Sequence, residues 1–290
     1  MPFVTRQIDL SLALASGALN ERGDNAITLR GLRAEVLINN VGSELAFSRA
    51  QLRVYGMKME DMQRFNTLAR NVIQQRNDEI TISAGDALTG VRQVFSGTIS
   101  YANVNLFGAP NVCMDIAATP GLYYRMLAAA PNSYPGQSDV AEIIGSLAGR
   151  MGFAFENHGV SVRISDHYTS GTLIDQLWDV AETAGILCSI ENKTVRIWPN
   201  NGSIKGPPIE VSPQTGLIGY PTFTPVGLRV EMEFRNDILV GRKLNLISSV
   251  PQASGEWYIN NMTHELSTMS HQGPWKTVAL ISKQGLTRAR

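Results

Sequence analysis

Residues Leu228–Arg235 read LRVEMEFR, a run in which each apolar side chain is followed by a charged one. Because a β-strand points successive side chains to opposite faces of its sheet, this period of two predicts a strand with one buried face and one charged face. The charged face carries both signs, so its residues either pair across neighbouring strands or contact a partner. This run decides the fold class, because the same period recurs on both sides of it.

The chain on either side of this run has the pattern of short strands. After it, we predict strands over 239–249, 256–268 and 275–282. Before it, residues 1–130 contain alternating segments whose inward residues are Ala34/Val36/Ile38, Leu45/Phe47, Ala50/Leu52/Val54, Ile80/Ile82/Ala84, Phe95/Gly97/Ile99/Tyr101 and Val112/Met114/Ile116/Ala118. A phase slip near Ser48–Arg49 indicates a bulge. A short helix is predicted over 58–69, with one face formed by Met59, Met62, Phe65 and Leu68. Many short strands separated by turns predict a small barrel or sandwich.

Residues 137–199 have the period of helices instead. A first helix is predicted from the spacing of Val140, Ile143, Ile144, Leu147, Ala148 and Met151, with Ser138 placed to cap it and Gly152 to end it. A second is predicted from Leu173, Ile174, Leu177, Trp178, Ala181 and Ala184, and it ends at Gly185. Each helix precedes a predicted hairpin. The first hairpin pairs Phe153–Phe155 with Val160–Ile164 through a turn at 157–159, and the second pairs Ile186–Ile190 with Val195–Trp198 through Asn192–Lys193.

An offset of 33 residues relates these two helix–hairpin segments, at Ala148/Ala181, Gly152/Gly185 and Val162–Ile164/Val195–Ile197. The offset indicates an internal duplication, and coincidence within a short window is the alternative. Linkers are predicted at Pro131–Gly136, Pro199–Gly202 and Gly206–Pro208. The predicted fold class is therefore mainly β with an α+β insertion. It has a first β-barrel-like domain over 1–130, an α/β module over 137–199 and a second β-barrel-like domain over 207–290. Whether the two β domains pack against each other stays open.

The composition limits the classes of function. The 290 residues include 25 basic and 25 acidic side chains and carry no formal net charge, which argues against a general binder of nucleic acid or anionic membranes. Charged residues make up only 17% of the chain. An average soluble domain has roughly 25%, so we expect partners to cover part of the surface.

Redox state and membrane insertion are also constrained. Cys113 and Cys188 are the only cysteines, and we expect both to be reduced, with a structural disulfide as the alternative. No stretch is long and apolar enough to span a bilayer. Asp9 interrupts the apolar N-terminal stretch, which we interpret as a strand and turn rather than a signal peptide.

The sequence contains no residue spacing typical of a catalytic or metal-binding site. The sequence lacks the phosphate-binding, nucleophile-elbow, zinc and C-x-x-C motifs. No two of the four histidines, His158, His167, His264 and His271, lie within five residues of each other. His264 alternates with Met262 and Leu266, so we expect a packed core histidine. A hydrolytic triad around Asp166–His167 is the alternative to a pair that occurs by chance.

The paired acidic residues also indicate no catalytic or metal-binding site. Glu60–Asp61 and Asp78–Glu79 are typical of helix or strand starts, and Asp175 and Asp179 of a solvated helix surface. We therefore predict no catalytic, cofactor-binding or metal-binding residues.

Two stretches resemble a known family. The first contains Gly216–Thr224 (GLIGYPTFT), Phe234–Ile238 (FRNDI) and Gly241–Leu244 (GRKL), followed by Gly255–Ile259 (GEWYI) and His264–Leu266 (HEL). In the second, Leu52–Met57 (LRVYGM) precedes the predicted helix that carries Met62–Leu68 (MQRFNTL). These turns and packing positions resemble baseplate hub proteins of contractile-tailed bacteriophages, and the resemblance covers most of the chain.

The resemblance implies a structural, non-enzymatic protein of the phage virion, made in the host cytoplasm and without cofactors. Hubs of this family are homotrimeric rings in which each subunit gives two β-barrel-like tube domains. They join the tail tube protein to the central spike protein and form part of the DNA channel. The resemblance is compatible with contacts to the tape-measure protein and baseplate wedge proteins, and it implies DNA only in transit and no stable membrane insertion. The alternatives are an extracellular carbohydrate- or peptidoglycan-binding β module and a cell-wall hydrolase.

Overall fold

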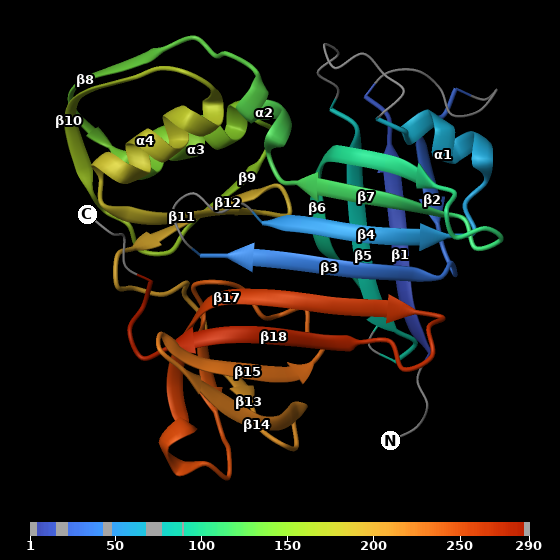
Figure 1. Cartoon of the computed structure of the whole chain (residues 1–290). Coiled ribbons are helices and arrows are strands. Elements are labelled where there is room, and N and C mark those ends of the chain that lie inside the picture. The colour runs from blue at the N-terminus through green and yellow to red at the C-terminus, as the bar shows by residue number, and fades with distance from the viewer. Residues whose placement is uncertain (1–4, 16–22, 43–47, 68–76, 89, 287–290) are drawn as a thin grey trace. The chain divides into compact units, whose positions relative to one another are not determined.

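The chain is mostly β-structure with an α/β insertion, as the alternating sequence predicts (Figure 1). The computed structural model describes residues 5–15, 23–42, 48–67, 77–88 and 90–286. Its contacts divide the chain into two units, neither of which is continuous in sequence. Unit 1 comprises residues 1–39, 48–123 and 264–275, and unit 2 comprises residues 40–47, 124–263 and 276–290. The assignment of tube domains to 1–130 and 207–290 stays a prediction.

Unit 1 is an antiparallel β-structure. Its strand order is β2 (Ala26–Leu29), β1 (Arg6–Ala13), β5 (Glu79–Asp86), β6 (Gly90–Asn105), β7 (Cys113–Thr119), β4 (Arg49–Tyr55) and β3 (Ala34–Val41), followed by the end of β17 (Gly255–Thr268). β6 has 16 residues because it pairs with two neighbours, with β5 over Gly90–Thr98 and with β7 over Thr98–Asn105. It therefore joins the two halves of the unit.

The predicted inward residues form most of the core of unit 1. The buried ones include Ala34, Val36, Ile38, Ala50, Leu52, Val54, Ile80, Ile82, Ala84, Phe95, Ile99, Met114, Ile116 and Ala118. The prediction for Tyr101 is wrong. A bulge between Ile99 and Tyr101 shifts the phase of β6, so Ala102 is buried and Tyr101 faces outward. One added residue reverses the inside–outside pattern of every residue that follows it.

Short helices complete unit 1. The helix predicted over 58–69 is α1 (Met59–Phe65), which buries Met62 and Phe65. Leu68 and Ala69 lie outside the described residues, as does the strand predicted at Leu45/Phe47, so the phase slip near Ser48–Arg49 stays a prediction. The chain passes from unit 1 to unit 2 within α2 (Leu122–Met126).

Unit 2 begins with the α/β module. Its elements are β8 (Asn132–Asp139), α3 (Val140–Arg150), β9 (Ala154–Asn157), β10 (Arg163–Thr169), α4 (Leu173–Thr183), β11 (Ile186–Glu191) and β12 (Thr194–Pro199). The apolar faces of both helices pack on the sheet of β9, β12 and β11 (Figure 1). Gly152 and Gly185 follow the helices with φ of 70° and 65°, so the predicted helix ends are confirmed. The predicted cap of α3 is wrong by one residue, because Asp139 rather than Ser138 accepts the N–H groups of Ala141 and Glu142.

Two further predictions for the module are wrong. Residues 131–136 are not a linker, since β8 occupies most of them and pairs with β10. Pro135 and Gly136 mark a bulge opposite Asp166, whose φ is 48° and whose Oδ1 accepts the Gly136 N–H at 2.8 Å. The first predicted hairpin does not form, because β9 pairs in parallel with β12 and β10 pairs with β8.

The second predicted hairpin is confirmed. β11 and β12 pair through Asn192 and Lys193, whose φ values of 51° and 57° are those of a tight hairpin turn. Because the helices repeat while the strands after them pair differently, the internal duplication stays a prediction.

The rest of unit 2 is a second β region. It contains β13 (Ile209–Val211), β14 (Leu217–Thr224), β15 (Gly227–Glu233), β16 (Lys243–Leu246), a 3-10 turn at Pro251–Ala253, the first part of β17, and β18 (Trp275–Ser282). β15 is the run that decides the fold class, and it buries Leu228, Val230 and Met232. Of the two alternatives for its charged face, pairing across strands is observed, since Lys276 Nζ on β18 lies 2.8 Å from Glu231 Oε2. Of the strand predicted over 239–249, only Lys243–Leu246 forms.

Trp198, near the end of β12, attaches the module to this β region. Its indole is buried with Leu187 and Ile204. Gly241 lies against the ring, and a Cβ at that position would be 2.8 Å from Trp198 Cζ2. The Ile204 N–H donates to the Gly241 carbonyl at 2.8 Å. The missing side chain at Gly241 therefore lets the indole pack closely.

Candidate functional site

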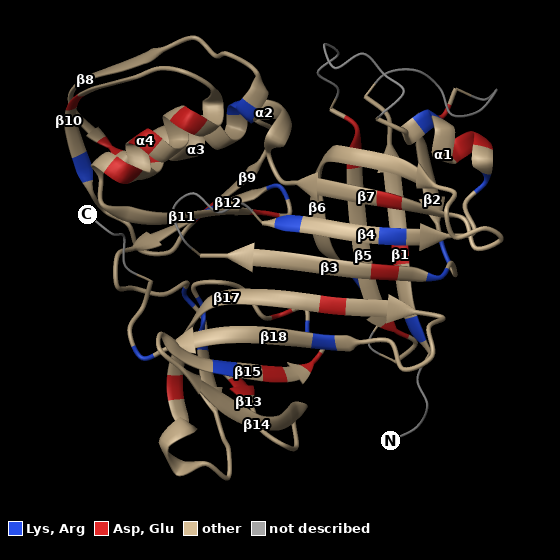
Figure 2. Cartoon of the chain, in the orientation of Figure 1, with Lys and Arg blue, Asp and Glu red and all other residues tan. Residues whose placement is uncertain are grey.

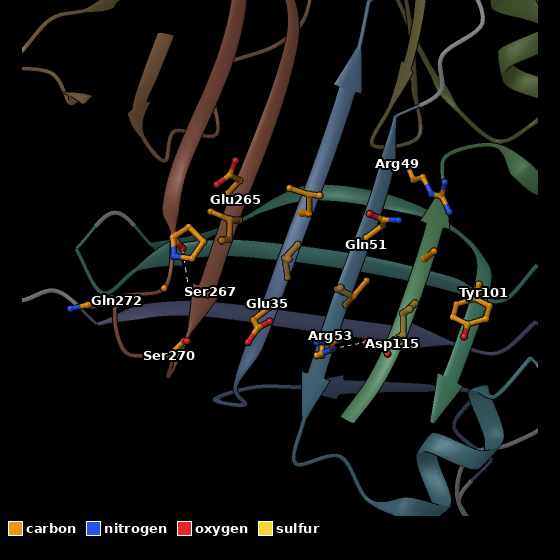
Figure 3. Close-up of a pocket in the computed structure, with 18 of the residues that line it drawn as sticks. Glu35, Arg49, Gln51, Arg53, Tyr101, Asp115, Glu265, Ser267, Ser270 and Gln272 are labelled. Carbon is orange, nitrogen blue, oxygen red and sulfur yellow. Dashed lines mark hydrogen bonds and ion pairs between the residues drawn. The ribbon is translucent and has the colours of Figure 1, made fainter. Parts of the chain in front are cut away.

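A groove of about 870 Å³ lies on the outward face of unit 1 (Figure 3). The period of two on β3, β4 and β7 turns Glu35, Arg53 and Asp115 to this face, while their sequence neighbours Val36, Leu52 and Ile116 are buried. Residues 265–267 of β17 and the following loop, Ser270–Pro274, form the other side. The groove is therefore assembled from segments that are far apart in sequence.

The central charges of the groove are paired. Arg53 Nε donates to Asp115 Oδ1 at 2.8 Å, the dashed contact in Figure 3, and Asn105 Nδ2 donates to Asp115 Oδ2 at 3.1 Å. Burial alone would raise the pKa of Asp115, but the hydrogen bonds from Arg53 and Asn105 outweigh it and hold the pKa below its usual value. The same hydrogen bond raises the pKa of Arg53. Arg53 and Asp115 are therefore both charged at neutral pH and compensate each other.

A second ion pair lies beside the first. Arg33 Nη2 is 3.1 Å from Glu35 Oε1, and its guanidinium carbon is 4.3 Å from the centre of the Tyr55 ring. Figure 2 shows that acidic and basic residues occupy neighbouring strands of this sheet. The face therefore carries charges of both signs side by side.

The remaining polar groups of the groove support its walls. Ser267 Oγ donates to the Pro274 carbonyl at 3.3 Å, which fixes the loop between β17 and β18. Within the described ranges, no group of three His, Cys, Asp or Glu residues is arranged to hold a metal ion. None of the helices that the structure describes is long and apolar enough to cross a membrane. The arrangement suits contact with a polar surface.

The four histidines are dispersed through the fold. His158 Nε2 lies 3.3 Å from Glu156 Oε2, and His167 Nε2 lies 3.0 Å from Asp179 Oδ2. His264 is 2% exposed, and burial lowers its pKa to about 4, so the prediction of a packed core histidine is confirmed. His271 is the one that lines the groove of unit 1.

The paired acidic residues noted in the sequence lie at element starts or contact neighbouring groups in the fold. Asp175 forms a capping box with Thr172 at the start of α4, and Asp78 Oδ1 accepts the Ala15 N–H at 2.8 Å. Glu60 and Asp61 lie in the first turn of α1. Asp179 is not simply solvated, because it contacts His167. The expectation that the chain has no catalytic, cofactor-binding or metal-binding residues stays a prediction.

Both cysteines are free, as expected. Cys113 is buried on β7, and burial raises the pKa of its thiol, whereas Cys188 is half-buried on β11.

A buried carboxylate lies in the module, where sequence patterns indicate nothing unusual. Burial raises the pKa of Glu191 to about 7, although Arg196 opposes the shift. Arg196 Nη1 is 3.9 Å from Glu191 Oε2, while its Nε donates to Glu156 at 2.7 Å. Because one guanidinium serves two carboxylates, the charge on Glu191 is only partly compensated.

The groove of unit 1 was not predicted from sequence. Its residues belong to strands whose neighbours are set by the fold. The sequence offers one indication of the groove, which is that Arg53 and Asp115 occupy outward positions of two predicted strands. In the structure these strands, β4 and β7, pair in a register that places Arg53 directly opposite Asp115.

Comparison with known proteins gives one family match and several matches to solved structures. A family model described as baseplate hub gp41 matches residues 24–278. Among solved structures, a tail protein from Neisseria meningitidis MC58 superposes with a TM-score of 0.63 at 8% identity, over 94% of this chain and 96% of that one. The 43 kDa tail protein of prophage MuSo2 from Shewanella oneidensis gives a TM-score of 0.58 at 8% identity, over 97% and 99% of the two chains.

A third solved structure comes from a secretion system. The E. coli c3393 protein is a component of the type VI secretion system with structural similarity to the T4 bacteriophage tail proteins gp27 and gp5. It matches with a TM-score of 0.55 at 9% identity, over 99% of this chain and 77% of that one. At these identities the structural matches show the fold alone. No curated protein matches the chain significantly.

Proposed function

The chain belongs to the baseplate hub gp41 family, and from this premise we propose that three copies of it close into a ring that joins a phage tail tube to the central spike. The chain is a structural component of a phage baseplate and thus of the virion. The observation that carries the proposal is the family match over residues 24–278, which spans both units. A ring of three identical subunits uses a head-to-tail interface that closes on itself.

The charge pattern supports a ring through which DNA passes. Cations that are free to contact phosphate displace counterions and hold DNA strongly. On the outward face of unit 1, Asp115 engages Arg53, and Glu35 engages Arg33. Zero net charge and the low share of charged residues fit the same role. In this proposal DNA moves through the ring without being retained.

The proposed partners lie on both sides of the ring. The tail tube protein contacts one side and the central spike protein the other, and contacts with the tape-measure protein and baseplate wedge proteins belong to the same proposal. In this role the chain is structural and not an enzyme, it needs no cofactor, and it does not insert stably into a membrane.

No described feature favours the two alternative functions. A carbohydrate-binding groove presents aromatic rings on which sugars stack, and Tyr101 is the only Phe, Trp or Tyr among the described residues that line the groove of unit 1. A hydrolytic triad at Asp166–His167 would need both side chains for catalysis. Asp166 instead accepts the Gly136 N–H within a bulge, and His167 contacts Asp179.

The proposal is tested by measuring the mass of the full chain in solution and imaging it in negative stain. The expected result is a particle of three times the 31.6 kDa chain mass with a central hole. A monodisperse monomer at every concentration tested would contradict the ring. Zymography on peptidoglycan is the matching test of the hydrolase alternative, because clearing that one point substitution abolishes would refute a purely structural role.

A further inference from the structure

An exposed apolar strip runs along β14 and the turn that follows it. Ile218, Tyr220, Phe223 and Val226 are 41%, 74%, 59% and 64% exposed. The sequence from Val211 to Leu228 contains no charged residue. Large apolar side chains on the surface of a soluble protein are normally scattered among charged ones. We call these four residues the β14 strip.

The strip lies at the end of a sheet. In the strand order of the described residues, β14 is a terminal strand, and β15 is its only partner. The outer edge of β14 therefore has backbone donors and acceptors that no described strand occupies. Free edges of this kind pair with other chains unless charges, proline or a bulge protect them.

The edge is protected against unlimited strand addition but not against a specific partner. The register of β14 on β15 moves from Ile218 opposite Glu231 to Thr222 opposite Arg229, so a bulge interrupts the ladder. Gly219 in the bulge has a φ of 66°, and Pro221 has no N–H to donate. The apolar side chains stay exposed on both sides of this break, where a matching surface can cover them.

We propose that the β14 strip is the surface through which one copy of this chain contacts the next copy in the ring. Interfaces between permanently associated copies are more apolar than transient ones, and a strip without charge fits that class. A head-to-tail ring needs two different surfaces on each copy. Among the described strands of unit 1, β2 also has a single partner, β1, so a further free edge is present on each copy. This inference rests on the proposed ring.

The test replaces Phe223 with a photo-crosslinking aromatic amino acid in the full-length chain. The purified protein is irradiated over a range of concentrations, and intact tails that contain it are irradiated as well. Tyr168, which is 63% exposed in the α/β module, carries the same replacement as the matched control. Mass spectrometry of the products identifies what each position touches without removing an apolar side chain.

The expected product from position 223 is the chain cross-linked to a second copy of itself, with no such product from position 168. In addition, Phe223→Asp is expected to weaken self-association about tenfold or more, since hot-spot residues of an interface have effects of that size. Circular dichroism and the melting temperature of this variant should match those of the wild type, because the side chain is exposed.

Two outcomes would overturn the inference. One is a cross-link from position 223 only to a different tail protein, and the other is no self cross-link at any concentration or in intact tails. Either result together with a three-fold ring would reject the β14 strip and leave the proposed function standing. Self cross-links from position 223 without a three-fold ring would support the strip and contradict the ring.

Discussion

Replacing Gly241 with alanine tests how the α/β module is attached to the second β region. Gly241 has a φ of 86°, and a Cβ at this position would lie 2.8 Å from Trp198 Cζ2, 3.0 Å from Trp198 Cε2 and 3.3 Å from Ile204 Cδ1. The Gly241 backbone is held at both ends, since its N–H donates to the Ile259 carbonyl and its carbonyl accepts the Ile204 N–H, each at 2.8 Å. The turn at Gly241 and the buried indole of Trp198 therefore cannot move freely to admit a methyl group.

Two costs add in Gly241→Ala. An L-residue in the left-handed region costs about 1–2 kcal/mol relative to glycine. Overpacking against a buried ring costs about 1–3 kcal/mol. The expected loss in the free energy of unfolding is therefore about 2–5 kcal/mol.

Gly152→Ala is the matched control. Gly152 has a φ of 70°, and a Cβ there would meet no atom within 4 Å. The free energy of unfolding of Gly152→Ala should therefore fall only by the cost of the left-handed backbone, about 1–2 kcal/mol. Urea denaturation followed by circular dichroism measures both variants, and the excess loss in Gly241→Ala isolates the contact with Trp198.

A double-mutant cycle tests whether the excess loss of stability in Gly241→Ala comes from contact with the Trp198 indole. In a Trp198→Leu background the ring atoms nearest to position 241 are gone, so Gly241→Ala should lose about as much stability as Gly152→Ala. Equal losses for Gly241→Ala and Gly152→Ala in the wild-type background would refute the reasoning, because Trp198 could then not lie over Gly241.

Three further predictions concern charged groups. Burial lowers the pKa of His264 to about 4 from 6.5, so the stability that its neutral ring gives is present above pH 6.5 and is lost as the pH falls toward 4. This loss is about 3 kcal/mol, and His264→Leu should remove that pH dependence in denaturation curves. The pH dependence that Glu191 gives to stability has the opposite sign. Burial raises its pKa from 4.5 to about 7, so the stability of its protonated form is present below pH 4.5 and is lost as the pH rises through 7. Glu191→Gln should therefore match the wild type at pH 4 and exceed it at pH 8 by about 3 kcal/mol. Asp115→Asn should cost at most about 1 kcal/mol, because the pair with Arg53 is partly exposed, and it should increase binding of duplex DNA at low salt in a mobility-shift assay, whereas Arg53→Gln should not.

The strands with one buried face were the most predictable part of the fold. At β3 and β15 buried residues alternate with half-buried or exposed ones in the structure, as they alternate in sequence, because a half-buried strand imposes that period directly. The helix ends at Gly152 and Gly185 were predictable for a similarly local reason, since a left-handed residue closes each helix.

The errors arose where a partner distant in sequence determines the structure. Pro135–Gly136 is a turn signal in sequence, yet β10 pairs across it and makes it a bulge. Tyr101 follows the alternation of β6 until the bulge against β7 reverses it. Neither partner can be read from the local pattern, because the pattern does not say which strands become neighbours.

The groove of unit 1 shows the same limit. Arg53 and Asp115 each lie between two predicted inward residues, but their contact depends on the pairing of β4 with β7 in one register. The contribution of the loop after β17 depends on a segment about 150 residues further along the chain than Asp115.

Cryo-electron microscopy of intact tails tests the central claim most directly. We expect three copies of this chain in a closed ring between the tail tube and the central spike, with the DNA path through its centre. A different number of copies around the tube axis, or a tube–spike junction built without this chain, would contradict it.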